Sequence, residues 1–262
     1  TQPVRMWNSN HPDYQEGKSY TVAKFIPDIQ GEQVMLEGAE KTALTENVTK
    51  AEMDPWVLLS HKRAAQAAKE GILSDIQFSI ADSKKDEGIR PSMSQRLLDR
   101  LPCLLPGGSI ITAANACLMH DGAAFVVLCS EAYRKKHGLT PQAAFRFGTA
   151  IGSDPFMSPK TAVLAIRKLL KQTALSIDEI YSLEVNEAFA VIDVLLEREF
   201  PGIRERLNPL GGALAYGHPY GASGAIILLH LLKDLELNQG RFGICGVAAA
   251  GGIGTALLVE KV

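Results

Sequence analysis

The chain has 262 residues, 46% of them hydrophobic, and a formal net charge of -2 at pH 7. This length suffices for one large α/β domain or two small ones, and the hydrophobic content supports a substantial core. The small net charge gives no reason to expect nucleic acid or an acidic membrane surface as a partner. The longest apolar runs are far shorter than the roughly 20 residues that a membrane helix needs, so we expect no membrane partner either.

The four cysteines indicate a reducing environment. Cys103, Cys117, Cys129 and Cys245 show no paired spacing of the kind that binds metals or forms redox motifs. We therefore expect no metal site, reduced thiols and a cytoplasmic location.

The beginning of the chain has an unusual pattern. Residues 1–53 are polar and irregular, and the first residue is not methionine. We interpret this region as the interior of a longer protein rather than its beginning. A processed product, a trimmed chain or one piece of a split protein would each explain it, and composition does not choose among them.

The first clear helical pattern covers residues 54–73. Asp54 can cap this helix, Pro55 suits its first turn, and Gly71 can end it. The apolar run at residues 123–129 (AAFVVLC) predicts a buried strand. The other elements expected in this half are strands at 75–80 and 109–112 and helices at 94–101 and 131–137.

The second half alternates strands and helices regularly. Ser158 and Pro159 predict the start of a helix, and Ser176 and Glu179 form a second capping pattern. The buried stripe expected on the first helix consists of Val163, Ile166, Leu169 and Leu170. The other expected elements are strands at 144–151, 181–185, 242–250 and 255–260 and helices at 187–200 and 222–235. This alternation predicts a layered α/β fold with a buried sheet.

The most informative motif surrounds His218, which lies between glycines just before a helical run. Glycines allow a sharp turn and a close approach of ligand to backbone, and Pro219 biases His218 toward an extended conformation. Because residues 222–235 predict a helix, a ligand near His218 would also face a helix N-terminus. A lone histidine is usually structural, but this setting favours a catalytic role.

Four loops carry small or polar residues at the carboxyl ends of predicted strands, where α/β proteins usually place their sites. They are residues 115–122, residues 186–190, the His218 loop and residues 248–254. Taken alone, Asn186 is typical of a helix cap, and the last loop is typical of a tight hairpin. The order and spacing of all four loops together indicate a shared site.

These motifs resemble the C-terminal two-thirds of a thiolase, the family that makes or cleaves 3-ketoacyl-CoA thioesters. The resemblance rests on NEAFA at 186–190, GGAxAxGHPxGASGA at 211–225, the closing GGxG turn and TAxNAxxxxDGAA at 112–124. It implies a thiolase-like layered α/β/α fold. Residues 109–262 would form a complete C-terminal half, and residues 1–108 would be the remainder of the N-terminal half with its lid region.

The resemblance also implies acyl transfer in two steps, through an acyl-cysteine intermediate. His218 matches the histidine that activates the nucleophile and donates to the thioester oxygen, and Asn186 matches the asparagine of the same oxyanion hole. The backbone at Ala250 and Gly251 would contribute to a second oxyanion hole. Coenzyme A is a substrate in this scheme, and no cofactor is implied. The side chains that we expect to contact coenzyme A or substrate are Cys117, Phe189 and Met157.

Two departures from the family pattern bear on activity. The nucleophilic cysteine of thiolases belongs to a motif upstream of Thr1, and none of the four cysteines here occupies that motif. Thiolases also carry a second cysteine, the acid/base for carbon–carbon bond chemistry, where this chain has Ala248. Cys245 lies three residues earlier, on the opposite face of the strand and about 10 Å away, so we do not expect it to substitute. Alanine cannot move a proton, which argues against ordinary Claisen chemistry.

Two functions fit these observations. The first is a thiolase-type acyl-CoA acyltransferase. Its expected partners are an acyl-CoA, further copies of the chain in a homodimer or homotetramer, and the missing N-terminal segment. The second is a thiolase-like protein without catalysis that binds CoA esters or supports a partner subunit. Intact Asn186 and His218 favour the first function, whereas Ala248 favours the second or a reaction that stops at thioester transfer.

Overall fold

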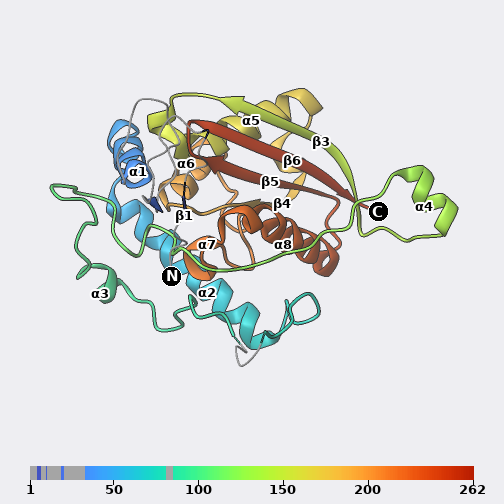
Figure 1. Ribbon diagram of the computed structural model, residues 1–262, viewed down its shortest axis with the longest axis horizontal. Coiled ribbons are helices and arrows are strands. Elements are labelled where there is room, and N and C mark those ends of the chain that lie inside the picture. Colours follow the sequence, from blue (N-terminus) through green and yellow to red (C-terminus); the bar gives the residue numbers. More distant parts are fainter. Residues whose placement is uncertain (1–4, 7–9, 11–18, 21–32, 81–84) are drawn as a thin grey trace.

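The computed structural model describes residues 5–6, 10, 19–20, 33–80 and 85–262. A mixed four-stranded sheet forms its centre, in the order β3-β6-β5-β4 (Figure 1). Strands β4 and β5 are parallel, and β6 pairs antiparallel with both β5 and β3. The strands are β3 (Ala143–Gly152), β4 (Ile180–Val185), β5 (Phe242–Ala249) and β6 (Ile253–Lys261). The expected layered α/β class is confirmed.

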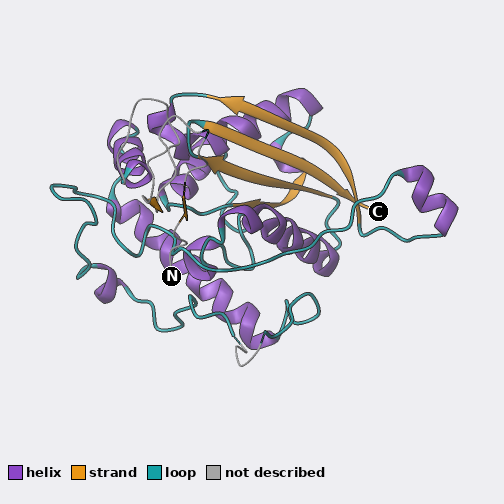
Figure 2. Cartoon of the chain, viewed as in Figure 1, coloured by secondary structure: helices purple, strands orange, loops and turns teal. Residues whose placement is uncertain are grey.

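Helices cover both faces of this sheet (Figure 2). Helix α5 (Thr161–Thr173) packs against β3, β5 and β6, while α8 (Ser223–Asn238) packs chiefly against β4 and β5. Successive side chains of a strand point to opposite faces, so β5 contributes to both layers. Ile244 joins the larger core cluster on the α5 side, and Cys245 joins the smaller cluster with Ile227 and Leu231 of α8.

The remaining elements surround this three-layer core. A two-residue pair of strands, β1 (Arg5–Met6) and β2 (Ser19–Tyr20), is antiparallel. The α-helices are α1 (Val34–Thr45), α2 (Lys50–Glu70), α3 (Gln95–Leu98), α4 (Glu131–His137), α6 (Val191–Glu199) and α7 (Ala213–Tyr216). The 3-10 helices are η1 (Pro155–Lys160), η2 (Ile177–Glu179) and η3 (Tyr220–Ala222).

Helix α2 begins earlier than the sequence pattern predicts. Thr49 is its N-cap, in a capping box with Glu52, and Asp54 is a buried residue within the helix. The expected end is confirmed, because Gly71 adopts a left-handed conformation (φ 66°) that caps the helix. The expected irregular character of residues 1–53 is wrong for α1, whose N-cap Gln33 makes no side-chain hydrogen bond that would mark its start. Most of residues 1–32 lie outside the described part of the chain.

Several other boundaries also differ from expectation. Ser158 lies inside η1, and α5 starts only at Thr161, although the expected stripe on α5 is buried throughout. No strand forms at 75–80 or at 109–112, where Thr112 makes only an isolated bridge to Cys103. The capping box of Ser176 and Glu179 is confirmed. Helix α4 and strands β3 to β6 form within two residues of the expected bounds at each end.

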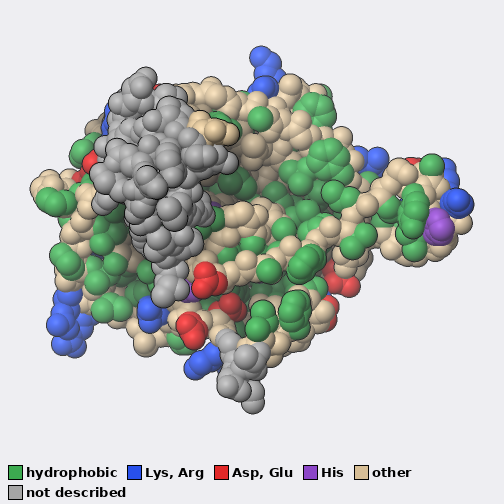
Figure 3. Space-filling view, in the orientation of Figure 1, with side chains coloured by type: hydrophobic (Ala, Val, Ile, Leu, Met, Phe, Trp, Pro, Cys, Tyr) green, Lys and Arg blue, Asp and Glu red, His purple; other side chains and the backbone are tan. Residues whose placement is uncertain are grey.

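The segment at residues 123–129 is extended but is not a buried strand. Phe125 is 79% exposed and Val127 is 94% exposed, and residues 121–130 form no helix or strand. No residue of α4, which follows directly, is buried. Figure 1 shows α4 projecting from the body, and Figure 3 shows hydrophobic side chains along the segment that leads to it. The expectation of burial is wrong because an apolar β-prone run is buried only where neighbouring strands cover it.

We expect Val127→Lys to leave stability unchanged while reducing self-association. Val127 is 94% exposed, so its replacement removes no buried area, and the free energy of unfolding should change by less than about 0.5 kcal/mol. A charge in an exposed apolar run lowers its tendency to aggregate. Urea unfolding and light scattering measure the two effects. Val185→Lys, at a fully buried position of β4, is the matched control and should unfold the chain.

Candidate functional site

Asn186 lies at the carboxyl end of β4, beside the neighbouring parallel strand. Its backbone N–H donates to the carbonyl of Gly246 in β5 at 3.0 Å. Its side chain is 1% exposed, and neither the amide nitrogen nor the amide oxygen has a hydrogen-bond partner. The alternative role of a helix cap is wrong, since α6 begins after Ala190. An unsatisfied buried carboxamide is costly and calls for a physical explanation.

His218 lies in the loop between α7 and α8. Gly217 before it has a φ of 88°, which favours glycine, and α8 begins at Ser223. His218 Nδ1 lies 2.6 Å from Ser223 Oγ, so one ring nitrogen is already engaged. Burial lowers the pKa of His218 below its usual value, because a charged imidazolium is disfavoured away from water. The ring is therefore neutral near pH 7.

The loops of Asn186 and His218 lie on either side of residues 115–119. On one side, Cys117 N–H donates to the carbonyl of Ala188 at 2.9 Å. On the other side, His218 N–H donates to the carbonyl of Leu118 at 2.8 Å. Isolated bridges between Ala116 and Phe189 and between Met119 and His218 join the same segment to both loops. The structure thus brings three of the expected loops together, while the meeting of the two side chains at one carbonyl stays a prediction.

The fourth loop is the turn between β5 and β6. Gly251 and Gly252 have φ angles of 78° and 74°, and Gly252 N–H donates to Ser158 Oγ at 3.0 Å, which anchors the turn on η1. Ala248 packs against the larger core cluster, on the face opposite to that of Cys245. The expectation that Cys245 lies on the opposite face of the strand from position 248 is confirmed. Burial also raises the pKa of the Cys245 thiol well above its usual value.

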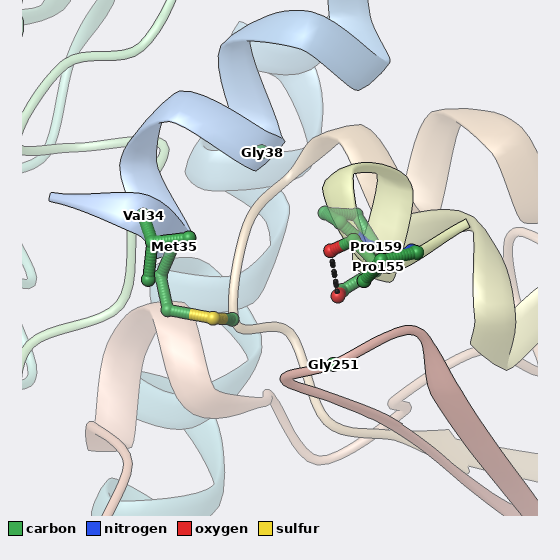
Figure 4. A pocket seen from close by; sticks show the side chains of 7 residues that line it. Val34, Met35, Gly38, Pro155, Pro159 and Gly251 are labelled. Carbon is green, nitrogen blue, oxygen red and sulfur yellow. Dashed lines mark hydrogen bonds between the residues drawn. The ribbon is translucent and has the colours of Figure 1, made fainter. Parts of the chain in front are cut away.

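A shallow hollow beside this turn is packed so closely that it leaves no room for a water molecule. Figure 4 shows Met35 and Gly38 on α1, Pro155 and Pro159 on η1, and Gly251 at the tip of the turn. A hydrogen bond of 2.9 Å from Ser158 Oγ to the carbonyl of Pro155 shapes the η1 side. The lining is mainly apolar, so these residues pack α1 and η1 against the backbone of the turn.

The carboxyl group of Glu187 connects the Asn186 loop to two helices. Ser60 Oγ of α2 donates to it at 2.7 Å, and Leu214 N–H of α7 donates to it at 3.2 Å. Its pKa is raised because burial disfavours the charged form. Since α7 leads directly into the His218 loop, Glu187 holds that loop relative to Asn186. The sequence signal that could have identified Glu187 is its place in the NEAFA motif, directly after Asn186.

The other residues that the sequence places in the site have different surroundings. Phe189 is 6% exposed, belongs to the core and forms a bridge with Ala116. Cys117 is half-buried, and burial raises the pKa of its thiol to about 12. Met157 is half-buried on η1, between two residues that line the hollow. The roles of these three in binding coenzyme A stay predictions.

The described residues contain neither a candidate metal cluster nor a helix able to span a membrane. Within residues 33–80, 85–262 and the short N-terminal pieces, no group of three or more histidine, cysteine, aspartate or glutamate side chains could hold a metal ion. In the same part of the chain, no helix has the length and apolar character required to cross a bilayer.

Comparison with known proteins connects this geometry to a family. The family model of the thiolase N-terminal domain matches residues 2–132, and that of the thiolase C-terminal domain matches residues 139–261. The steroid 3-ketoacyl-CoA thiolase FadA6 of Mycobacterium tuberculosis is 35% identical over 86% of the chain and 56% of that protein. The 3-oxoadipyl-CoA/3-oxo-5,6-dehydrosuberyl-CoA thiolase of Escherichia coli is 34% identical over 91% of the chain and 63% of that protein. The chain therefore spans less than two thirds of these relatives.

Solved structures agree with these relatives. The acetyl-CoA acetyltransferase of Bacillus anthracis matches with a TM-score of 0.85 at 30% identity, over 99% of this chain and 68% of that one. Human mitochondrial 3-ketoacyl-CoA thiolase in complex with CoA matches with a TM-score of 0.83 at 28% identity, over 100% of this chain and 68% of that one. The motifs, the layered fold and both domain matches lead to one conclusion: this chain belongs to the thiolase family.

Proposed function

We propose that this chain carries the Asn186–His218 part of a thiolase-type acyltransferase site that acts on acetyl-CoA or 3-ketoacyl-CoA thioesters. The supporting observation is the Asn186 carboxamide, buried at a strand end with both polar atoms unpaired. A thioester oxygen would accept from the amide nitrogen, and a bound water would donate to the amide oxygen. Removal of one such donor typically costs about 10²–10³ in rate.

His218 is suited to take the proton of a thiol. When Nδ1 carries the hydrogen, it donates to Ser223 Oγ, and the lone pair of Nε2 is free to accept a proton. The lowered pKa of His218 keeps this neutral form dominant near pH 7. The thiolate then attacks the thioester carbonyl, the CoA thiolate leaves, and an acyl-cysteine forms.

We propose that the nucleophilic cysteine lies outside these residues, as the resemblance implies. Burial raises the pKa of both Cys117 and Cys245, which disfavours a reactive thiolate at either position. Cys129 lies on the exposed segment before α4, and Cys103 forms the isolated bridge with Thr112.

We propose that Ala248 confines the reaction to thioester transfer. Exchange of labelled CoA into acetyl-CoA needs only the nucleophile and His218, whereas cleavage of a 3-ketoacyl-CoA needs a further acid/base. The full-length gene product should therefore catalyse the exchange and form an acyl adduct on one cysteine, detected as a mass increase. Absence of both the exchange and the adduct would refute the acyltransferase function.

The substitution Ala248→Cys should raise thiolysis of acetoacetyl-CoA at least about tenfold. A thiol at this position would supply the proton transfer that alanine cannot make. Such transfer typically raises the rate 10²–10⁴-fold when the group is ideally placed. The rate of CoA exchange serves as the internal reference. Ala248→Ser, which adds a polar group of poor acidity, is the matched control. An unchanged ratio of thiolysis to exchange would show that position 248 does not face the reacting carbon.

The substitution Ser223→Ala should lower the exchange rate about fivefold. It removes a hydrogen bond that contributes roughly 1 kcal/mol and that holds one tautomer of His218. Nitrogen-15 NMR of the imidazole should show a mixture of tautomers in place of one. Ser223→Thr keeps the hydroxyl and is expected to retain both the single tautomer and the rate.

A second candidate function is binding of CoA esters without catalysis, which Ala248 favours. Calorimetry with acetyl-CoA would then show binding without turnover, and no binding would exclude it. We also propose a cytoplasmic homodimer or homotetramer, an expectation that rests on the family resemblance and that analytical ultracentrifugation would test.

A further inference from the structure

The loop beside His218 contains a second histidine, His120, that the acyl-transfer chemistry does not use. Its ring occupies the space where a side chain at Gly217 would lie, so a Cβ at position 217 would overlap it. On the other side, a Cβ at Gly88 would approach the His120 ring to 3.4 Å. The imidazole is therefore enclosed between two glycines from other segments, and one of these immediately precedes His218.

His120 also makes a hydrogen bond to the carbonyl that holds His218. His120 Nδ1 lies 3.3 Å from the carbonyl oxygen of Leu118. Because a carbonyl can only accept, Nδ1 carries the hydrogen in this contact. The same oxygen accepts the backbone N–H of His218 at 2.8 Å. One acceptor is thus shared by the His120 side chain and the His218 backbone.

Further contacts hold residues 118–122 and the His218 loop in one position relative to each other. A Cβ at Gly122 would lie 2.9 Å from Pro219, so the two loops approach closely at a second point. Residues 119 and 218 form an isolated parallel bridge between these points. Burial raises the pKa of the Asp86 carboxyl. The electrostatic effect of the nearby His120 acts in the opposite direction and is smaller. His120 therefore connects three segments of the chain.

We propose that His120 is a positioning residue that fixes the backbone of His218 through the shared carbonyl of Leu118. This inference rests on the proposed role of His218 for its functional meaning. The imidazole contributes in two separable ways: its ring fills the space above Gly217, and its Nδ1–H orients the Leu118 carbonyl. Loss of the donor would leave that carbonyl free to tilt, and the amide of His218 would lose its alignment.

Three variants separate the two contributions. His120→Asn keeps a donor near the position of Nδ1 but removes most of the ring. His120→Phe keeps a ring but has no donor, and His120→Ala removes both. The measurement is hydrogen exchange of the His218 amide, followed by NMR in the 262-residue chain. The reference is the Cys117 amide, which donates to Ala188 on the other side of the same segment.

We expect His120→Phe and His120→Ala to accelerate exchange of the His218 amide about tenfold or more. His120→Asn should stay within about threefold of the unmodified chain, and the Cys117 amide should be unchanged in all three. Equal exchange of His218 in every variant would overturn the inference. Parallel acceleration of Cys117 would also overturn it, since that result would mean general loosening.

The exchange measurement needs no substrate, so it remains decisive if acyl transfer is absent. Where the full-length protein does catalyse CoA exchange, His120→Phe should lower the turnover rate and leave KM for acetyl-CoA unchanged. In a His218→Ala background, the same substitution should have no further effect on that rate. An equal additional loss in this background would show that His120 acts independently of His218.

Discussion

Replacement of His218 by alanine is expected to reduce CoA exchange by the full-length protein about a thousandfold, equivalent to ~4 kcal/mol of transition-state stabilisation. The substitution removes the base that would ionise the nucleophilic thiol, a role that typically contributes 10²–10⁴ in rate. It also removes a donor to the thioester oxygen, which typically contributes 10²–10³ in rate. The two losses are not expected to multiply, because both act through one imidazole. The measurement is the initial rate of label transfer between CoA and acetyl-CoA.

His137→Ala provides the matched control for this experiment. His137 ends α4, in which no residue is buried, so its removal should leave the exchange rate unchanged. Circular dichroism and urea unfolding should show that both variants keep the fold. Undiminished acylation in His218→Ala would refute the assigned role of this residue, even if other parts of the site proved correct.

The second large effect concerns acid stability and His230. This side chain lies on α8 against the ring of Tyr216, and burial lowers its pKa from 6.5 to about 4. Because the pKa in the folded chain lies below that in the unfolded chain, the contribution to stability is fully present above pH 6.5. It is lost as the pH falls toward 4, since the unfolded chain binds the proton more readily. The expected loss is ~3 kcal/mol, a large part of the stability of a typical domain.

A comparison with His230→Leu isolates this effect. The buried carboxyl groups of Glu184, Glu187 and Asp193 have raised pKa values and oppose the trend, because they favour the folded chain as the pH falls. These groups and the buried His61 are present in both proteins, so their contributions largely cancel in the difference. The difference in free energy of unfolding between the two proteins should fall by about 3 kcal/mol between pH 7 and pH 4. A constant difference would mean that His230 titrates normally.

The sequence predicts helix ends and buried faces most accurately where contacts within a few residues determine them. The capping box of Ser176 and Glu179, the end of α2 at Gly71 and the stripe of α5 all formed as expected. These features depend on contacts within a few residues, so no distant partner is needed. The predicted start of α2 is wrong because Asp54 and Pro55, which are typical of a helix start, lie inside the helix. The N-cap is Thr49.

For the candidate site, the sequence motifs indicated Asn186 and His218, and the structure shows which residues contact them. Ser223 follows His218 by five residues, but only the turn of η3 brings its hydroxyl to the imidazole. His120 lies far from Gly88 and Gly217 in the sequence, and no local pattern predicts that its ring packs against both. Such contacts join segments that are separated in the chain, and periodicity carries no information about them.

Composition and motif order alone were enough to predict the layered α/β class and the thiolase family, and they indicated Asn186 and His218 as candidate site residues. Tertiary structure alone decided the exposure of residues 123–129 and the unpaired state of the Asn186 amide. The physical reason is that propensity and motif depend on the residues themselves. Burial and hydrogen-bond satisfaction depend on which other segments of the fold lie beside them.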